Sequence, residues 1–229
     1  SFTVTVVIGC KGVPATIVGT SGNDEITGTD GRDVIAALEG DDEVQGLGGN
    51  DHICGDEGID LLLGDAGDDD MFGGPGDDSG LFFGGTGSMF GGPGDDQMFG
   101  GEGYDFMLGD LGDDIMAGGD GDDGVLGHLG NDIMYGDAGD DHMEGYGGND
   151  ELFGGDGDDE MRGEDGDDTL EGGAGFDTMY GDNPFVPLDL GNDNLNSVDG
   201  IVDNDNLDGG DGIDTCTSNP DPEVNCELD

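Results

Sequence analysis

A nine-residue pattern repeats without a gap from Gly19 to Tyr180, which makes 18 consecutive copies. With Gly19 as the first place, the fourth place is Gly in all 18 copies, and the sixth is Asp in 17, failing only at Gly87. The eighth place is apolar in 17 copies, failing only at Gly80, and it holds all nine Met of the chain. An unbroken period of this length predicts a solenoid of stacked repeats.

The composition would indicate disorder if this period were absent. Of 229 residues 54 are Gly and 7 are Pro, and the formal net charge is −55, from 58 acidic and three basic residues. This charge argues against nucleic acids and anionic membranes as partners. It also opposes compaction, so a folded state needs bound counter-charge, for which divalent cations are the obvious source. No apolar run reaches the roughly 18 residues that would predict membrane insertion.

Each copy divides into a turn and a short strand. In the copy from Gly154 to Arg162, the first six residues have turn composition, and the last three place one apolar side chain between two outward ones. Glycines let backbone carbonyls crowd inward, and the sixth-place aspartate adds a carboxylate. Hard oxygen ligands in a flexible loop suit Ca²⁺ better than Mg²⁺ or Zn²⁺.

The candidate calcium ligands are therefore the sixth-place aspartates, with two more from weaker copies that follow Tyr180. They are Asp24, Asp33, Asp42, Asp51, Asp60, Asp69, Asp78, Asp96, Asp105, Asp114, Asp123, Asp132, Asp141, Asp150, Asp159, Asp168, Asp177, Asp205 and Asp214.

The pattern Gly-Gly-x-Gly-x-Asp-x-apolar-x resembles the calcium-binding nonapeptide repeat of RTX (repeats-in-toxin) proteins, which bacteria secrete. The resemblance covers residues 19–180 closely and 188–217 loosely. It implies an all-β fold: a right-handed parallel β-roll, a β-helix solenoid with two copies per turn and about nine turns, and Ca²⁺ between loops of adjacent turns.

This resemblance also implies which loops are neighbours. Loop 19–24 would stack on loop 37–42, and loop 28–33 on loop 46–51. Two columns of nine loops leave eight gaps each, so we expect roughly 10 to 16 calcium ions, fewer than 16 if the Gly87 loop is defective. The copy that contains Gly87 is either a drifted repeat or a bulge that presents two phenylalanines outward.

We expect three segments along the chain. Residues 1–18 alternate apolar and polar positions, which predicts a strand that caps the first repeat or pairs with the edge of another molecule. Residues 19–180 form the calcium-binding roll, and residues 181–229 form degenerate repeats and a C-terminal cap.

The four cysteines suit two disulfides in an oxidising compartment, Cys10 with Cys54 and Cys216 with Cys226. The alternative is four free thiols in a reducing cytosol.

Apolar residues also occupy the ninth place, which faces outward, in the middle copies. Exposed apolar residues at scattered positions need no explanation. Contiguous ladders of them favour a surface for protein contact, most simply self-association, over the alternative of ordinary β-propensity on a sheet surface. The predicted ladders are Leu63, Leu81, Phe99, Tyr135 and Phe153 on one sheet, and Phe72, Phe90, Leu108 and Leu126 on the other.

No catalytic motif is present, and the three histidines, His52, His128 and His142, are expected to be satisfied surface residues. The sequence therefore predicts a non-enzymatic, secreted or cell-surface calcium-binding structural protein that self-associates into a fibre, sheath or surface layer. Two alternatives remain: an adhesive or ligand-binding β-roll module, and the secretion-associated part of a larger exported protein. Ice binding is disfavoured because the third place carries no regular Thr or Asn array.

Overall fold

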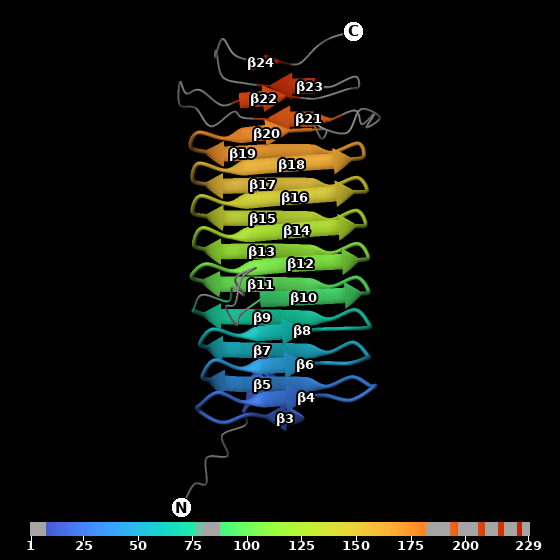
Figure 1. Cartoon of the computed structure of the whole chain (residues 1–229), viewed down its shortest axis with the longest axis vertical. Coiled ribbons are helices and arrows are strands. Elements are labelled where there is room, and N and C mark those ends of the chain that lie inside the picture. Colours follow the sequence, from blue (N-terminus) through green and yellow to red (C-terminus); the bar gives the residue numbers. More distant parts are fainter. Residues whose placement is uncertain are drawn as a thin grey trace, which may run out of the picture.

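The chain is wound as a parallel β-roll of about nine turns, in which successive strands alternate between two facing sheets (Figure 1). The structure is a computed structural model. It describes residues 8–76, 78, 88–181, 193–196, 206–208, 215–217 and 224–225. These residues form strands and turns only, and none belongs to a helix that could span a bilayer. The predicted all-β roll is confirmed.

Two sheets of eleven strands make up the walls of the roll. Sheet I consists of β4 (Glu25–Thr27), β6 (Glu43–Gln45), β8 (Leu61–Leu63), β10 (Ser88–Pro93), β12 (Phe106–Leu111), β14 (Gly124–Leu129), β16 (His142–Gly147), β18 (Glu160–Asp165), β20 (Thr178–Tyr180), β22 (Asn206–Asp208) and β24 (Val224–Asn225). Sheet II consists of β3 (Ile17–Val18), β5 (Val34–Glu39), β7 (His52–Glu57), β9 (Asp70–Pro75), β11 (Gln97–Glu102), β13 (Ile115–Asp120), β15 (Ile133–Ala138), β17 (Glu151–Asp156), β19 (Thr169–Ala174), β21 (Asn194–Asn196) and β23 (Thr215–Thr217).

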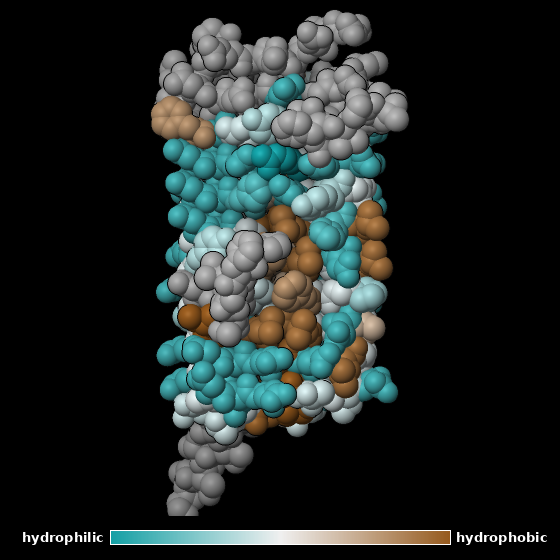
Figure 2. Space-filling view, in the orientation of Figure 1, coloured by the Kyte–Doolittle hydropathy of each residue, from teal (hydrophilic) through white to brown (hydrophobic). Residues whose placement is uncertain are grey.

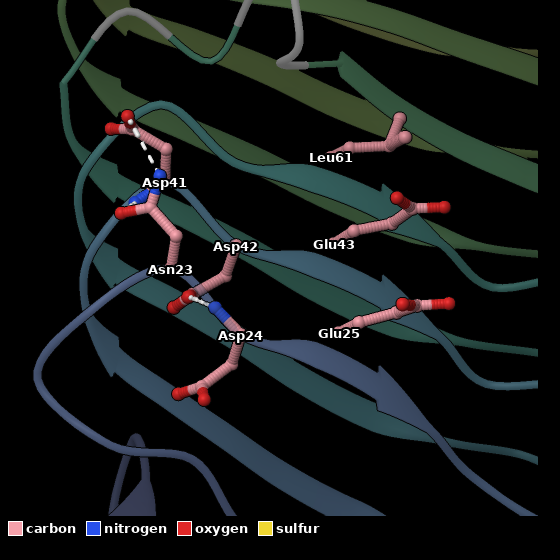
Figure 3. A pocket seen from close by; sticks show the side chains of 7 residues that line it. All are labelled: Asn23, Asp24, Glu25, Asp41, Asp42, Glu43 and Leu61. Atoms are coloured by element: carbon pink, nitrogen blue, oxygen red, sulfur yellow. Dashed lines mark hydrogen bonds between the residues drawn. The ribbon is translucent and has the colours of Figure 1, made fainter.

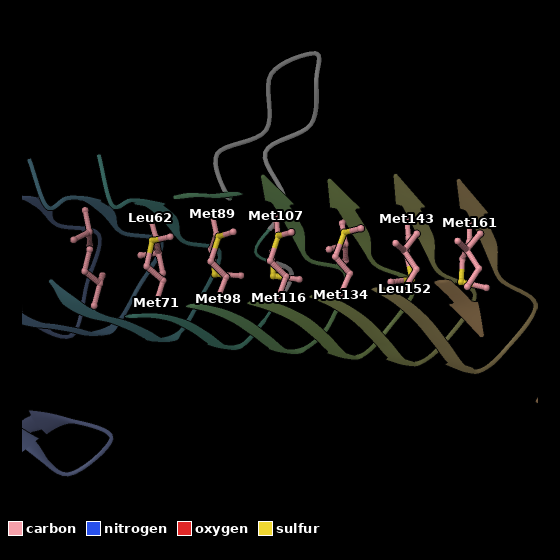
Figure 4. Packing of buried hydrophobic residues seen from close by; sticks show 14 of the residues in the cluster. Leu62, Met71, Met89, Met98, Met107, Met116, Met134, Met143, Leu152 and Met161 are labelled. Carbon is pink, nitrogen blue, oxygen red and sulfur yellow. The ribbon is translucent and has the colours of Figure 1, made fainter. Parts of the chain in front are cut away.

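The core is a double ladder of eighth-place side chains between the sheets (Figure 4). All nine Met lie in it and are fully buried, and Ile, Val and Leu take the same place in the other described copies. Because side chains alternate across a strand, the seventh and ninth places face outward while the eighth faces inward. The inward role that the sequence assigns to the eighth place is confirmed.

Most strands are longer than the three residues predicted for each copy. From β9 to β19 each strand has six residues, so it runs on through the first three places of the next copy. In β10 and β12, for example, Gly92 pairs with Asp110 and Pro93 with Leu111. The first half of each turn therefore also pairs with its neighbour, because identical backbones stacked in register keep their hydrogen bonds where the composition is typical of a turn.

Fourth-place glycines allow the turns to stack closely. Gly112 has φ of 137°, and a Cβ there would collide with the carbonyl oxygen of Gly94 one rung below. In the described copies from Gly40 onward the residue at this place has a positive φ, which favours Gly, whereas a Cβ on Gly22 or Gly31 in the first two copies would meet nothing.

From β3 to β20, paired residues in adjacent rungs are 18 positions apart except at one point, while the rungs formed by β21 to β24 have other separations. β8 pairs directly with β10, which places Met89 next to Leu62, and β9 pairs directly with β11, which places Met98 next to Met71. At this point the separation between equivalent residues is 27. No rung lies between these paired strands, so the register advances by one whole nine-residue copy.

This jump of one whole copy corrects two expectations. The loops stay stacked across this point, because Asp69 donates to Asp96 and Asp78 to Asp105, and Met89 pairs directly with Leu62 in the core. The described strands from β10 to β20 lie on the opposite sheet from the one expected. The outward ladders are therefore Leu63, Phe90, Leu108 and Leu126 on sheet I, and Phe72, Phe99, Tyr135 and Phe153 on sheet II, while Leu81 lies outside the described residues.

The described part of the N-terminal segment forms a small antiparallel hairpin, β1 (Gly9–Cys10) and β2 (Val13–Pro14). It packs on the outer face of sheet II, where Cys10 is buried with Val34 and Cys54. The predicted Cys10–Cys54 disulfide is confirmed and joins the hairpin to β7. The strand expected within residues 1–7 and the predicted partner Cys226 lie outside the described residues.

Candidate metal centres

The sixth-place aspartates form two columns, one along each edge of the roll. In each column the backbone N–H of one aspartate donates to Oδ1 of the aspartate in the next turn, at 2.7 to 3.1 Å. The column before sheet I contains Asp24, Asp42, Asp60, Asp78, Asp105, Asp123, Asp141, Asp159 and Asp177. The column before sheet II contains Asp33, Asp51, Asp69, Asp96, Asp114, Asp132, Asp150, Asp168 and Asp193.

These hydrogen bonds show that the loops are stacked as the resemblance to RTX repeats implies. Asp24 donates to Asp42 at 2.7 Å and Asp33 to Asp51 at 2.8 Å, so loop 19–24 lies on loop 37–42 and loop 28–33 on loop 46–51. Figure 3 shows the first of these contacts, beside a parallel exposed pair formed by Asn23 and Asp41.

The second carboxylate oxygen is the unusual feature of the columns. In eleven of the aspartates Oδ2 is buried and has no hydrogen-bond partner in the described structure: Asp42, Asp51, Asp60, Asp69, Asp96, Asp114, Asp123, Asp132, Asp141, Asp150 and Asp159. Burying an ionised oxygen without a partner is costly. One such atom would be an exception, but a regular series of them indicates sites for bound cations.

Backbone carbonyls surround the same oxygens. A Cβ on Gly136 would collide with Oδ2 of Asp141 and the carbonyl oxygen of Gly154, so these oxygens converge on one glycine. Within the described ranges no cluster of three or more His, Cys, Asp or Glu side chains could hold a metal ion. A cation in these loops would therefore take many of its ligands from carbonyls, which is a donor set that suits Ca²⁺.

Burial has a clear electrostatic effect on these carboxyls. Desolvation raises the pKa of Asp96 to about 8, and those of Asp114 and Asp150 to about 7, although the hydrogen bond from the neighbouring aspartate N–H opposes the shift. Neighbouring carboxylates raise these pKa values further. Without a cation the columns therefore resist full ionisation at neutral pH.

The first aspartate of each column differs from the others. Oδ2 of Asp24 accepts hydrogen bonds from the backbone N–H and Oγ1 of Thr20, at 2.6 and 2.9 Å. Oδ2 of Asp33 likewise accepts hydrogen bonds from the backbone N–H and Oγ1 of Thr29, at 2.7 and 2.9 Å. These two carboxylates have partners within their own loops, because Thr takes the second place of these copies.

The structure places seventeen of the predicted ligands in the two columns, while Asp205 and Asp214 lie outside the described residues. It also adds Asp193, which the prediction omitted. Asp193 is buried, and its Oδ1 accepts a hydrogen bond from the backbone N–H of Asp168 at 2.9 Å. The signal was present in the sequence, since Asp193 is the sixth residue of the weaker copy 188–196.

The histidines lie outside the columns. His52 is not a surface residue as expected, because the N-terminal hairpin covers it, and its ring contacts Asp70 and the Cys10 carbonyl. His142 lies on sheet I beside Glu144, and their hydrogen bond lowers the pKa of Glu144 to about 2. His128 packs edge-on against the Tyr146 ring.

Comparison with protein families agrees with this geometry. The model of the RTX calcium-binding nonapeptide repeat matches residues 16–44, 27–62, 45–79, 90–125, 126–161 and 162–183. The chain belongs to this RTX repeat family. The matches stop at residue 79 and resume at residue 90, close to the point where the register of the roll jumps. No curated protein matches the sequence of this RTX chain.

Proposed function

We propose that this RTX chain is a non-enzymatic, extracellular structural protein whose folding is driven by Ca²⁺. The series of buried aspartate Oδ2 atoms without hydrogen-bond partners is the observation that carries this proposal. Calcium would supply the positive charge that these oxygens lack. Because such sites exist only when turns are stacked, binding energy becomes folding energy.

The individual ligands follow from the two columns. Each column has nine aspartates and therefore eight intervals between adjacent turns, so we propose up to about 16 ions, within the 10 to 16 expected. Each ion would use carboxylate oxygens of the column and carbonyls of the surrounding turn glycines. Asp193 belongs to this ligand set, and Asp205 and Asp214 remain predicted members.

A location outside the cell is consistent with both calcium and the disulfide. Sites of extracellular modules typically have Kd values of roughly 10⁻⁴ to 10⁻³ M, which would leave the chain unfolded where calcium is scarce. The Cys10–Cys54 bridge also favours an oxidising compartment.

Self-association through sheet I is the second part of the proposal. Six half-buried side chains form the sheet I apolar patch: Leu61, Leu63, Phe90, Phe106, Leu108 and Leu126. Figure 2 shows hydrophobic surface on the middle turns, with hydrophilic surface on the turns to either side. We propose a second copy as the occupant, because two flat apolar faces can pack on each other once calcium reduces the charge repulsion.

The calcium proposal is tested by far-UV circular dichroism of the chelated chain during titration with Ca²⁺, with Mg²⁺ as the control. We expect a disordered spectrum to become a β spectrum with Ca²⁺ alone. An unchanged spectrum would contradict the proposal.

Self-association is tested separately by sedimentation velocity in millimolar Ca²⁺. Leu108→Ser on sheet I should weaken assembly, while the matched change Ile133→Ser on sheet II should not. A calcium-folded protein that stays monomeric at all concentrations would remove the fibre, sheath or layer role, and would leave the alternative of an adhesive module or of a secretion-associated part of a larger protein.

A further inference from the structure

The outer face of sheet II carries an aromatic ladder with one missing ring. The ninth places of five adjacent rungs are Phe72, Phe99, Ala117, Tyr135 and Phe153. Phe72 and Phe99 are stacked, with ring centroids 5.1 Å apart and planes 7° apart. Tyr135 and Phe153 are stacked in the same way, at 5.0 Å and 12°. Only the central rung, with Ala117, lacks a ring.

The gap at Ala117 has the dimensions of one aromatic ring. Strands in a sheet are about 4.8 Å apart, so Phe99 and Tyr135 attach two spacings, or about 9.6 Å, apart. A ring placed midway would lie about 4.8 Å from each, inside the range in which aromatic pairs attract. Because Phe99 and Tyr135 each stack on a partner on the far side, neither ring is turned into the gap.

The sides of this gap suit a flat ligand. Ile115 and Ile133 flank it on the same strands as half-buried apolar neighbours. On the other flank lie Gly101 and Gly119, which have no side chains to obstruct entry. A hollow beside Tyr135 and Phe153, lined by glycines and by two aspartates, continues this open surface along the roll.

The negative charge around the gap favours a flat ligand that is positively charged. The strands that form the gap, β11, β13 and β15, contain no Lys, Arg or His. They carry exposed carboxylates at Glu102, Asp120 and Asp137, and the whole chain has a net charge of −55. An anionic or second acidic partner would be repelled here, while a cation would be attracted.

A cationic side chain lies beside an aromatic ring at two other places in the molecule. At one end of the aromatic ladder, Lys11 Nζ lies 5.1 Å from the centroid of the Phe72 ring. On sheet I, the planar guanidinium of Arg162 occupies the rung next to Tyr180 and lies 5.5 Å from its ring centroid. A planar cation beside an aromatic rung is therefore an arrangement that this fold already accommodates.

We propose that the gap between Phe99 and Tyr135, above Ala117, is a binding site for one planar aromatic cation. The ligand stacks between the two rings and places its positive charge toward Glu102, Asp120 and Asp137. This site requires the folded roll but not self-association.

The test is a titration of the calcium-saturated chain with proflavine, a planar aromatic cation, followed by its absorbance shift and fluorescence. We expect one site per chain with the red shift typical of stacking, and no binding of the planar anion fluorescein. Ala117→Phe fills the gap without changing the charge. It should weaken proflavine binding about tenfold or more and raise the melting temperature, because it completes the stack.

Two further variants serve as controls for this test. Leu126→Phe adds a ring on sheet I and should leave binding unchanged, and Tyr135→Leu removes one wall and should weaken it. If Ala117→Phe binds proflavine as tightly as the unmodified chain, the dye is held by charge alone and the proposal is overturned. It is also overturned if Ala117→Phe abolishes assembly of a dimer, since a side chain of a second copy would then be the occupant.

Discussion

The first turns of the roll and its middle turns have the same backbone but are stabilised differently. In the first turns Thr20 and Thr29 donate hydrogen bonds to Oδ2 of Asp24 and Asp33, and the Cys10–Cys54 disulfide ties the N-terminal hairpin to β7. In the middle turns the corresponding Oδ2 atoms, such as that of Asp114, have no such partner. The first loop of each column therefore has hydrogen bonds of its own, and the disulfide ties the hairpin to the first turns, whereas the loops from Asp42 and Asp51 onward have buried Oδ2 atoms for which a bound cation would supply the partner.

The side chains that fill the core also differ between the first turns and the middle turns. Ile17, Ile26, Ile35, Val44 and Ile53 line the first turns, whereas Met predominates from Met71 onward. β-Branched side chains favour strands and have few rotamers, while Met is flexible and adapts to its surroundings. If calcium drives folding as proposed, the first turns would be a preformed end on which the later turns are added, because the units of a repeat protein stabilise their neighbours.

Calcium removal should produce the largest effect and should separate the two regions. After chelation we expect hydrogen-exchange protection to disappear from residues 88–162, because their carboxylates lose the counter-charge, while part of the protection persists in residues 16–57. Exchange mass spectrometry at peptide resolution measures this. Equal loss in both regions would show that the first turns have no independent stability.

Acidification of the metal-free chain should have the next largest effect. Burial raises the pKa values of Asp96, Asp114 and Asp150 well above the usual 3.8 of an aspartate, to about 7 or 8. A raised folded-state pKa stabilises the fold below the unfolded pKa, and this contribution is lost as the pH rises through the folded pKa.

The metal-free middle turns should therefore be more ordered near pH 4 than at pH 8. Circular dichroism of the chelated chain across this range provides the measurement, and calcium affinity should fall over the same interval because protons compete for the carboxylates. Order that increases toward pH 8 without calcium would contradict the assignment.

Loss of the disulfide should affect the first turns only. Cys54→Ser opens a link between residues 44 positions apart, which typically costs about 2–4 kcal/mol of stability. Melting of the calcium-loaded variant, with the unmodified chain under reducing conditions as a control, gives the magnitude. Hydrogen exchange should show reduced protection near β5 and β7. Reduced protection throughout the middle turns would argue against two separately stabilised regions.

Replacing one aspartate of the middle turns should have a local effect. Asp114→Ala should remove or weaken the two calcium sites on either side of it and cost about 1–3 kcal/mol, without abolishing folding, because stability in a repeat fold is nearly a sum over neighbours. Isothermal titration calorimetry counts the ions lost. The matched change Asp33→Ala should release fewer ions, since Thr29 already satisfies one oxygen of Asp33.

Loss of one hydroxyl in the first turns should have the smallest effect. Thr29→Val removes the hydroxyl that donates to Asp33 at 2.9 Å, so stability without calcium should fall by about 0.5–1.5 kcal/mol. The first turns should then need more calcium to reach the same melting temperature. A calcium dependence identical to that of the unmodified chain would mean that Thr29 does not substitute for an ion.

Much of the site could be read from the repeat itself. The inward place of every Met follows from the period, because all copies repeat one backbone. The stacking of loop 19–24 on loop 37–42 came instead from the resemblance to RTX repeats, which implies two copies per turn. Burial of His52 under the hairpin was missed, although the predicted Cys10–Cys54 disulfide already brings residue 10 close to residue 52, because the alternating pattern of residues 1–18 does not show that the chain turns back as a hairpin over this face. The six-residue strands were missed for a related reason: their pairing depends on the neighbouring turn and not on local composition.

The amino-acid sequence alone predicts a carboxylate in all but one of the copies and one inward apolar side chain in all but one of them. Which sheet each described strand after position 87 joins depends on the tertiary structure. The direct pairing of β8 with β10 and of β9 with β11 keeps the later described strands at the same places within the repeat, because a separation of 27 is three whole copies instead of two. A shift by one nine-residue copy leaves a period of nine unchanged. Because successive copies alternate between the two sheets, the same shift exchanges the two faces and creates the ladder that Ala117 interrupts.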